Sequence, residues 1–126
     1  MTNVLVFLNS PTQAVIRCAE DSSTRKTKVY ADYNAFFGYG SITNSTDNIE
    51  LISWGSHQVL DKTGNPNLAS DGYHLAAGVS DDRLIDGGIA TSVAYDIDGD
   101  ARPQGPKPDI DADELFLPKG TLILLR

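Results

Sequence analysis

Short apolar runs, each ended by turn-forming residues, constrain the fold of this chain more than any other feature. Asn, Gly, Pro and Ser gather between the runs, and these residues favour turns. Apolar or alternating runs of this length are typical of β-strands. The runs cover residues 4–8, 14–18, 28–33, 49–54 and 58–60. The pattern therefore predicts an all-β fold.

Helices are not expected. No stretch repeats its apolar residues at the spacing of an amphipathic helix, and the best candidate, residues 81–85, amounts to one turn at most. Short strands joined by loops of varying length suit a β-solenoid or, as the alternative, a β-sandwich. Without a long linker, the 126 residues are expected to form a single domain. Its parts are strand-rich residues 1–68, an irregular Asp/Gly/Pro-rich segment at 69–114 and an apolar strand segment at 115–126.

The charge is uneven along the chain. Residues 1–60 hold four basic and five acidic groups, whereas residues 61–126 hold six and twelve, which gives a net charge of −7. This acidity argues against nucleic acid as a partner. A single cysteine, Cys18, excludes an internal disulfide and a cysteine-based zinc site. Apolar stretches fall short of the ~20 residues of a membrane span. Residues 1–10 show no secretory signal, so the localisation stays open.

Two segments carry a family resemblance. Residues 71–88 read DGYHLAAGVSDDRLIDGG, and residues 96–114 read DIDGDARPQGPKPDIDADE. Together they resemble the C-terminal end of right-handed parallel β-helix proteins of the pectate-lyase-like type. Upstream, VYADYNAFFGY at 29–39 resembles one rung of such a helix, and 55–57 with 65–68 resemble the connection that follows. The resemblance covers roughly residues 28–114.

This resemblance implies a short right-handed parallel β-helix of about three to four rungs. It also implies that the irregular segment 69–114, here called the clasp, covers the open edge of the last rung. Arg102, Asp109 and Glu114 are expected to hold the clasp, with a bidentate bond from Arg102 to a carboxylate. Asp111 stands where the family usually has Gly, which predicts an altered turn. Relatives of this type are extracellular.

The Asp-rich turn of the clasp suggests a cation site. Asp96, Asp98 and Asp100 alternate along it and supply the hard oxygen ligands that calcium takes. An EF-hand is excluded, because Gly99 is at the fourth position and Lys107 at the twelfth. Calcium is therefore the one cofactor to consider, for a calcium-stabilised β-solenoid module. The alternative is an Asp-rich turn neutralised by Arg102.

Aromatic residues gather in the middle of the chain and allow two interpretations. They stack inside the solenoid, or some lie outside and form a platform for a saccharide. The candidate binding residues are Tyr33, Phe37, Tyr39, Trp54 and His57.

No catalytic residues are assigned. His57 and His74 lack a partner at metal-ligand spacing, and Ser56 beside His57 does not by itself make a triad. His74 is expected to be packed and hydrogen-bonded. A few rungs are too short for the groove of a polysaccharide enzyme, so the favoured function is a non-catalytic structural or binding module. The alternative is a degenerate or partial polysaccharide lyase or glycoside hydrolase.

Self-association is expected, most simply as a dimer. Residues 122–125 are apolar without alternation and favour burial on both faces, against residues 4–8 or another subunit. The alternative is that the chain is a fragment whose missing partner is its own upstream solenoid.

Overall fold

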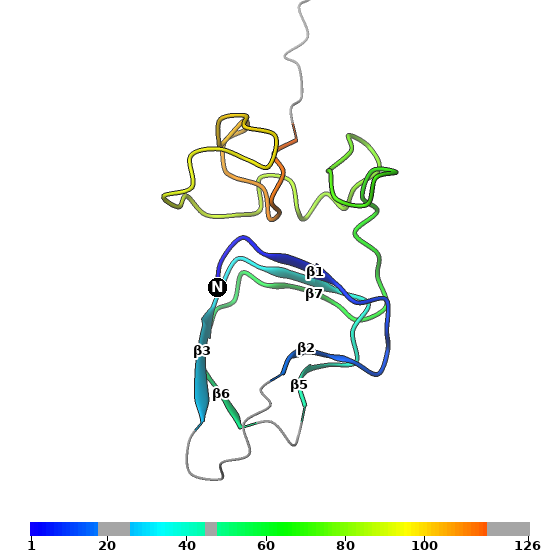
Figure 1. Ribbon diagram of the computed structural model, residues 1–126, viewed down its shortest axis with the longest axis vertical. Coiled ribbons are helices and arrows are strands. Elements are labelled where there is room, and N and C mark those ends of the chain that lie inside the picture. Colours follow the sequence, from blue (N-terminus) through cyan, green and yellow to red (C-terminus); the bar gives the residue numbers. More distant parts are fainter. Residues whose placement is uncertain (18–25, 45–47, 116–126) are drawn as a thin grey trace, which may run out of the picture.

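The computed structural model describes residues 1–17, 26–44 and 48–115. Within these ranges it is all-β, and no residue is helical. The strands are β1 (Leu5–Phe7), β2 (Ala14–Ile16), β3 (Thr27–Ala31), β4 (Ala35–Phe37), β5 (Ser41–Thr43), β6 (Ile49–Trp54) and β7 (Val59–Asp61) (Figure 1). The expected all-β class is confirmed.

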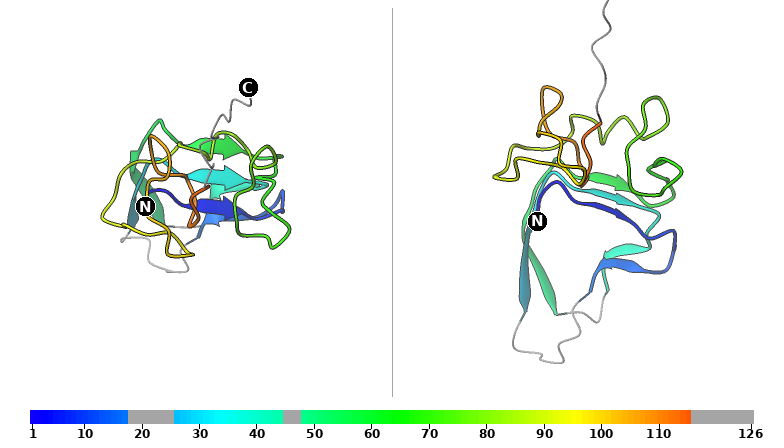
Figure 2. Two further views of the ribbon diagram at one scale, coloured as in Figure 1. Left: turned by 90° about the horizontal axis from the view of Figure 1, so that it is seen from above. Right: turned by 45° about the horizontal axis from the view of Figure 1, so that its top comes forward.

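The strands pair in parallel and form three small sheets, with strand orders β1-β4-β7, β2-β5 and β3-β6. The chain visits these sheets in the same order on each pass, and it returns to the first sheet 30 and then 24 residues later, from Leu5 to Ala35 to Val59. Figure 2 shows β1, β4 and β7 lying side by side. An immunoglobulin-type sandwich is built from antiparallel sheets, so the alternative β-sandwich does not describe this pairing.

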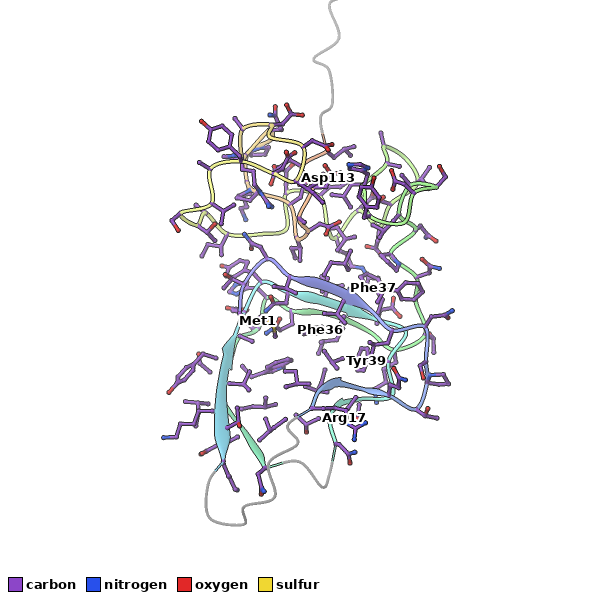
Figure 3. The ribbon with its side chains drawn as sticks, viewed as in Figure 1. Met1, Arg17, Phe36, Phe37, Tyr39 and Asp113 are labelled. Carbon is purple, nitrogen blue, oxygen red and sulfur yellow. The ribbon has the colours of Figure 1, made fainter. Side chains whose placement is uncertain are left out.

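The two faces of sheet β1-β4-β7 bury different partners, because successive side chains of a strand point to opposite faces. Ala35 and Phe37 pack against Leu75, Leu84 and Ile110 of the clasp. Phe36 lies on the other side of the sheet (Figure 3). Its ring stacks on Trp54 of β6, with ring centroids 5.8 Å apart. The central strand β4 is thus fully buried on both faces.

A buried asparagine ties successive passes of the chain together at the corner between β3 and β4. Asn34 is 0% exposed, and its Nδ2 donates to the carbonyls of Met1 and Asp32. Its Oδ1 accepts the Val4 N–H, and its own N–H donates to Gln58 Oε1. Every polar group of this buried side chain therefore has a partner, as burial requires.

The clasp lies over the outer face of sheet β1-β4-β7 and consists of turns and loops, with one isolated bridge between Tyr95 and Ala101 (Figures 1 and 2). The helical candidate 81–85 forms turns, in which the Leu84 N–H donates to the Asp81 carbonyl. The apolar segment 115–126 lies outside the described residues from 116 onward, as does Cys18.

Candidate functional site

Of the five predicted binding residues, two lie together at the surface, at the corner that follows β3. Tyr33 adopts the left-handed conformation, with φ 55°, and its ring stacks on His57 at a centroid distance of 4.3 Å and an interplanar angle of 8°. A non-glycine residue at positive φ is uncommon and costs conformational energy. The surrounding turn therefore holds Tyr33 in an orientation that the free chain avoids.

The carboxylate of Asp32 organises this pair. Its Oδ1 accepts the backbone N–H groups of Tyr33 and His57, and its Oδ2 lies 2.9 Å from Nδ1 of His57. The hydrogen bond from His57 lowers the pKa of Asp32 below its usual value. An ionised carboxylate only accepts, so Nδ1 carries the proton and the ring orientation is fixed. The His57 side chain remains 54% exposed.

A shallow cavity lies beside Tyr33. Its volume is about 210 Å³, and its walls are Tyr33, Ile89, Pro103, Pro106 and Pro108, with Lys107 and neighbouring backbone completing the rim. An aromatic face next to apolar walls and a few polar groups is the arrangement that binds the ring of a small organic molecule. Tyr33 contributes to the stacked pair and to this cavity at once.

The other predicted binding residues do not join this pair. Phe37 is 0% exposed and Tyr39 is 3% exposed, and Trp54 stacks on Phe36 inside the coil. Trp54 thus packs on the inner side of the sheet, as the first interpretation has it, whereas Phe37 is buried on the outer side, under the clasp. Of the candidate residues for an exposed saccharide platform, only Tyr33 and His57 therefore lie at the surface.

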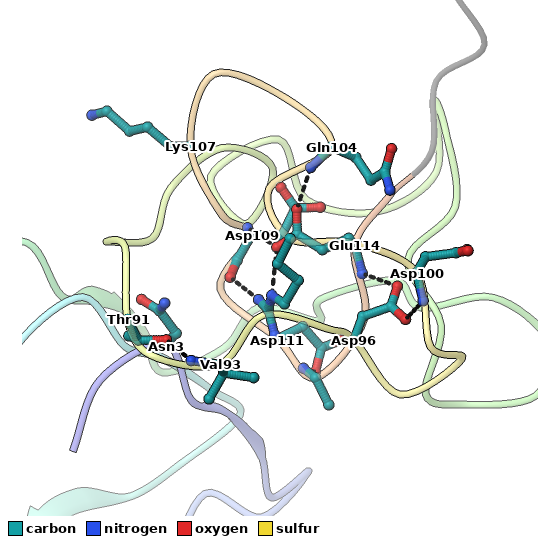
Figure 4. A network of polar contacts seen from close by, with 12 residues as sticks. Asn3, Thr91, Val93, Asp96, Asp100, Gln104, Lys107, Asp109, Asp111 and Glu114 are labelled. Carbon is teal, nitrogen blue, oxygen red and sulfur yellow. Dashed lines mark hydrogen bonds and ion pairs between the residues drawn. The ribbon is translucent and has the colours of Figure 1, made fainter.

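Arg102 and Glu114 hold the clasp from within. Arg102 Nε donates to Glu114 Oε1 at 2.7 Å, and the two side chains are 8% and 1% exposed. Nη2 of Arg102 donates to the Asp109 carbonyl, whereas the backbone N–H groups of Gln104 and Asp109 donate to Glu114 (Figure 4). The expected bidentate bond is instead one bond to a carboxylate and one to a carbonyl.

Asp109 acts through its side chain as an acceptor within the same network. Its two carboxylate oxygens accept the N–H groups of Asp86 and Leu115, at 2.6 and 2.8 Å. Burial nevertheless raises the pKa of Asp109, since the charged form loses its hydration. All three residues predicted to hold the clasp therefore lie in one network.

The predicted calcium ligands are not brought together. Asp96 Oδ1 accepts the N–H groups of Asp98 and Asp100, which closes the turn (Figure 4 shows Asp96 and Asp100). Its Oδ2 accepts the Glu114 N–H. The Asp98 carboxylate instead lies 2.9 Å from Nε2 of His74. Among the described residues, the one group of three or more His, Cys, Asp or Glu residues with ligand atoms within 4.8 Å of one another is His74, Asp98 and Asp113.

The surroundings of His57 bear on whether it belongs to a catalytic triad. In the part of the chain that the structure describes, its hydrogen bonds go to Asp32, and none joins the ring to a hydroxyl or thiol. An Asp–His pair without a nucleophile does not make a triad. The sequence analysis did not single out Asp32, Asp71 or Asp113. Asp71 and His74 also form an Asp–His pair, and their Asp-x-x-His spacing is a local signal that could have indicated it.

Comparisons with protein-family models, with curated proteins and with solved structures find no match to this chain. The residues that the structure describes contain no helix able to span a bilayer.

Proposed function

We propose that this chain is a non-catalytic binding and structural module, built as a short right-handed parallel β-helix of the pectate-lyase-like kind. The cyclic order in which the chain visits three parallel sheets supports this fold, because a solenoid stacks equivalent strands pass after pass. The loops 69–114 bury the outer face of the first sheet, whereas the sequence placed them over the open edge of the last rung. That expectation is wrong, because β7 has no neighbouring strand on its outer side among the described residues.

The ligand that we propose is a neutral saccharide, bound at Tyr33. The observation that carries this proposal is the rigid Tyr33–His57 stack at the edge of the 210 Å³ cavity. Aromatic faces pack on the apolar C–H faces of sugar rings. A net charge of −7 disfavours polyanionic chains such as polyuronates, so an uncharged glycan suits this surface better.

Calorimetric titration with xylohexaose and cellohexaose, with oligogalacturonate as the charged comparison, tests the ligand. Wild-type protein is expected to bind a neutral oligosaccharide, and Tyr33→Ala to lose at least about tenfold in affinity, in line with the loss of one stacking contact. Tyr95→Ala is the matched control, because Tyr95 is 64% exposed on the clasp. Equal affinity of both variants, or binding of oligogalacturonate alone, contradicts the proposal. Release of reducing or unsaturated ends in the same samples would instead show an enzyme.

We also propose that the module self-associates through its last pass. Among the described residues β7 is an edge strand, and Leu51, Ile52 and Leu60 of β6 and β7 are 37%, 41% and 47% exposed. An edge strand with unpaired backbone groups and exposed apolar side chains is a template for pairing with another chain. The simplest arrangement that satisfies it is a symmetric dimer.

A further inference from the structure

Three loops of the clasp place a histidine and two carboxylates at one point. His74 follows the segment after β7, Asp98 is in the turn at 96–100, and Asp113 is near the end of the clasp. One ligand atom of each residue lies within 4.8 Å of the other two. These residues are distinct from the Tyr33–His57 pair and from the Arg102–Glu114 contact.

The ring of His74 is oriented from behind by a fourth residue. Nδ1 of His74 lies 2.6 Å from Oδ2 of Asp71, whose Oδ1 accepts the backbone N–H groups of Tyr73 and His74. The ionised carboxylate accepts, so Nδ1 carries the proton and Nε2 is directed toward Asp98 and Asp113. A carboxylate that accepts the far N–H of a histidine is the usual outer partner of a metal-binding histidine.

The Nε2 atom of His74 is buried, and no described residue forms a hydrogen bond with it. It lies 2.9 Å from Asp98 Oδ2, but out of line for a hydrogen bond. A neutral ring would point its lone pair at two anionic groups, and a proton on Nε2 would have no aligned acceptor. A cation placed between the three groups satisfies all of them.

Asp113 provides the second independent indication. The residue is 6% exposed, and one oxygen, Oδ2, accepts the Leu75 N–H at 2.7 Å. No hydrogen bond to its other oxygen is found among the described residues, and neither Asp113 nor Asp98 forms an ion pair with a described Lys or Arg. A carboxylate this deeply buried is normally paired or bound to a metal, because an isolated buried charge is costly.

We propose that His74 Nε2, Asp98 and Asp113 bind a divalent transition cation of the zinc class, which links three loops of the clasp. One nitrogen and two carboxylate ligands suit zinc or a similar cation, whereas calcium takes six to eight oxygens. Bonds of about 2 Å place tetrahedral ligands about 3.3 Å apart. Asp98, whose side chain is 55% exposed on a turn, is able to make the small adjustment that this requires.

Titration of the chelator-treated 126-residue chain with ZnCl₂ tests the site by calorimetry, with the thermal unfolding midpoint as the second readout. One zinc ion per chain is expected, together with a rise in the midpoint, because a ligand that binds the folded state stabilises it. Asp98→Asn, on an exposed turn where folding is not at risk, is expected to weaken binding at least about tenfold. His74→Gln is expected to remove it. Asp71→Asn, which alters only the outer partner, is expected to weaken it about 10- to 100-fold.

Two controls keep the test specific. His57→Ala removes the other histidine, and Asp82→Asn removes an exposed carboxylate elsewhere on the clasp. Both are expected to bind zinc as the wild type does. Cobalt(II) is expected to give visible absorption bands of a low-coordinate site that are lost in Asp98→Asn. Absence of zinc binding, zinc binding unchanged in Asp98→Asn and His74→Gln, or binding of CaCl₂ in preference to zinc would each overturn the proposal.

Discussion

The carboxylate of Asp32 fills the space that a side chain on Gly55 would need. A Cβ built on Gly55 would overlap Cγ and both oxygens of Asp32. Gly55 has no positive φ, so glycine is required here for room and not for backbone conformation. Its N–H donates to the Ala31 carbonyl, which fixes β6 against β3 at this point. The stacked Tyr33–His57 pair thus depends on a glycine one pass further along the chain.

Gly55→Ala is expected to displace Asp32 and with it His57, so that the thermal unfolding midpoint falls by several degrees. Removing the carboxylate relieves the overlap, and the double variant Gly55→Ala/Asp32→Ala is therefore expected to be more stable than the sum of the single losses predicts. Thermal unfolding followed by circular dichroism measures all four proteins. Strictly additive losses would mean that the two residues do not share this space.

The buried ion pair of the clasp predicts a large loss on removal of one partner. Arg102→Met leaves the Glu114 carboxylate buried and without its cation, which costs about 3–5 kcal/mol of unfolding free energy. Urea unfolding checks the value. Arg83→Met is the comparison, because the Arg83 side chain is 48% exposed and its ion pairs are screened by solvent. A loss from Arg102→Met no larger than that from Arg83→Met would show that the pair does not hold the clasp.

The contacts of Arg83 predict how stability changes in acid. Its Nη2 lies 2.8 Å from Asp61 and 2.6 Å from Asp81, and the hydrogen bonds lower the pKa of both carboxyls below 3.8. Between the lower folded pKa and 3.8 the unfolded chain binds more protons, so stability is present above pH 3.8 and is lost as the pH falls through the folded values. Urea unfolding of wild type and Arg83→Gln between about pH 2.5 and pH 6 measures this. The variant is expected to have the shallower acid decline, and parallel curves would contradict the assignment.

The sequence predicted those strands in which apolar character or alternation is plain, and the structure has strands at all five predicted positions. It did not separate β4 (Ala35–Phe37) and β5 (Ser41–Thr43) as strands. β4 is apolar at every position, because the coil interior and the clasp bury opposite faces, so no alternation marks it. β5 is short and mostly polar, and its place is set by parallel pairing with β2.

The sequence predicted contacts within the candidate sites only where the contacting residues are close together in the chain or belong to one motif. Arg102, Asp109 and Glu114 all lie in the segment 96–114, which carries the resemblance to β-helix proteins, and they are in contact in the structure. His74 and Asp113 are far apart along the chain, and they meet because the loops between them fold over one sheet. The sequence does not tell a buried aromatic residue from an exposed one. Phe37 and Tyr33 are both aromatic, but only the folded structure shows that Phe37 is buried and that Tyr33 lies at the surface.

The exposed apolar edge of the last pass predicts the effect of a charge placed there. Leu60→Lys on β7 is expected to weaken self-association at least about tenfold, because a lysine on an edge strand opposes pairing with another chain. Val93→Lys is the matched control, since Val93 is 57% exposed on the clasp. Sedimentation equilibrium at micromolar concentrations gives the association constants. A wild-type monomer, or equal weakening by both variants, would contradict association through β7.

Asp111 is a clasp residue whose charge is unfavourable in the folded state at neutral pH. Its Oδ1 accepts the Ala112 N–H at 2.6 Å, but its Oδ2 is buried and has no hydrogen-bond partner within residues 1–17, 26–44 and 48–115. Burial raises the pKa of Asp111 to about 6, and neighbouring Asp113 and Asp109 add to this shift. The charged carboxylate that is present at neutral pH is thus poorly compensated in the folded state.

Asp111→Asn removes this charge and keeps an oxygen to accept the Ala112 N–H. It is expected to raise the unfolding free energy by about 1 kcal/mol at neutral pH, because it removes the buried charge, whereas the atom in the place of Oδ2 still lacks a partner among the described residues. Urea unfolding in the presence of a chelator measures the change without interference from metal binding. Asp82→Asn, at an exposed position, is expected to alter stability by less than about 0.5 kcal/mol. If Asp111→Asn is no more stable than that control, the Asp111 carboxylate has a partner in solution that compensates its burial.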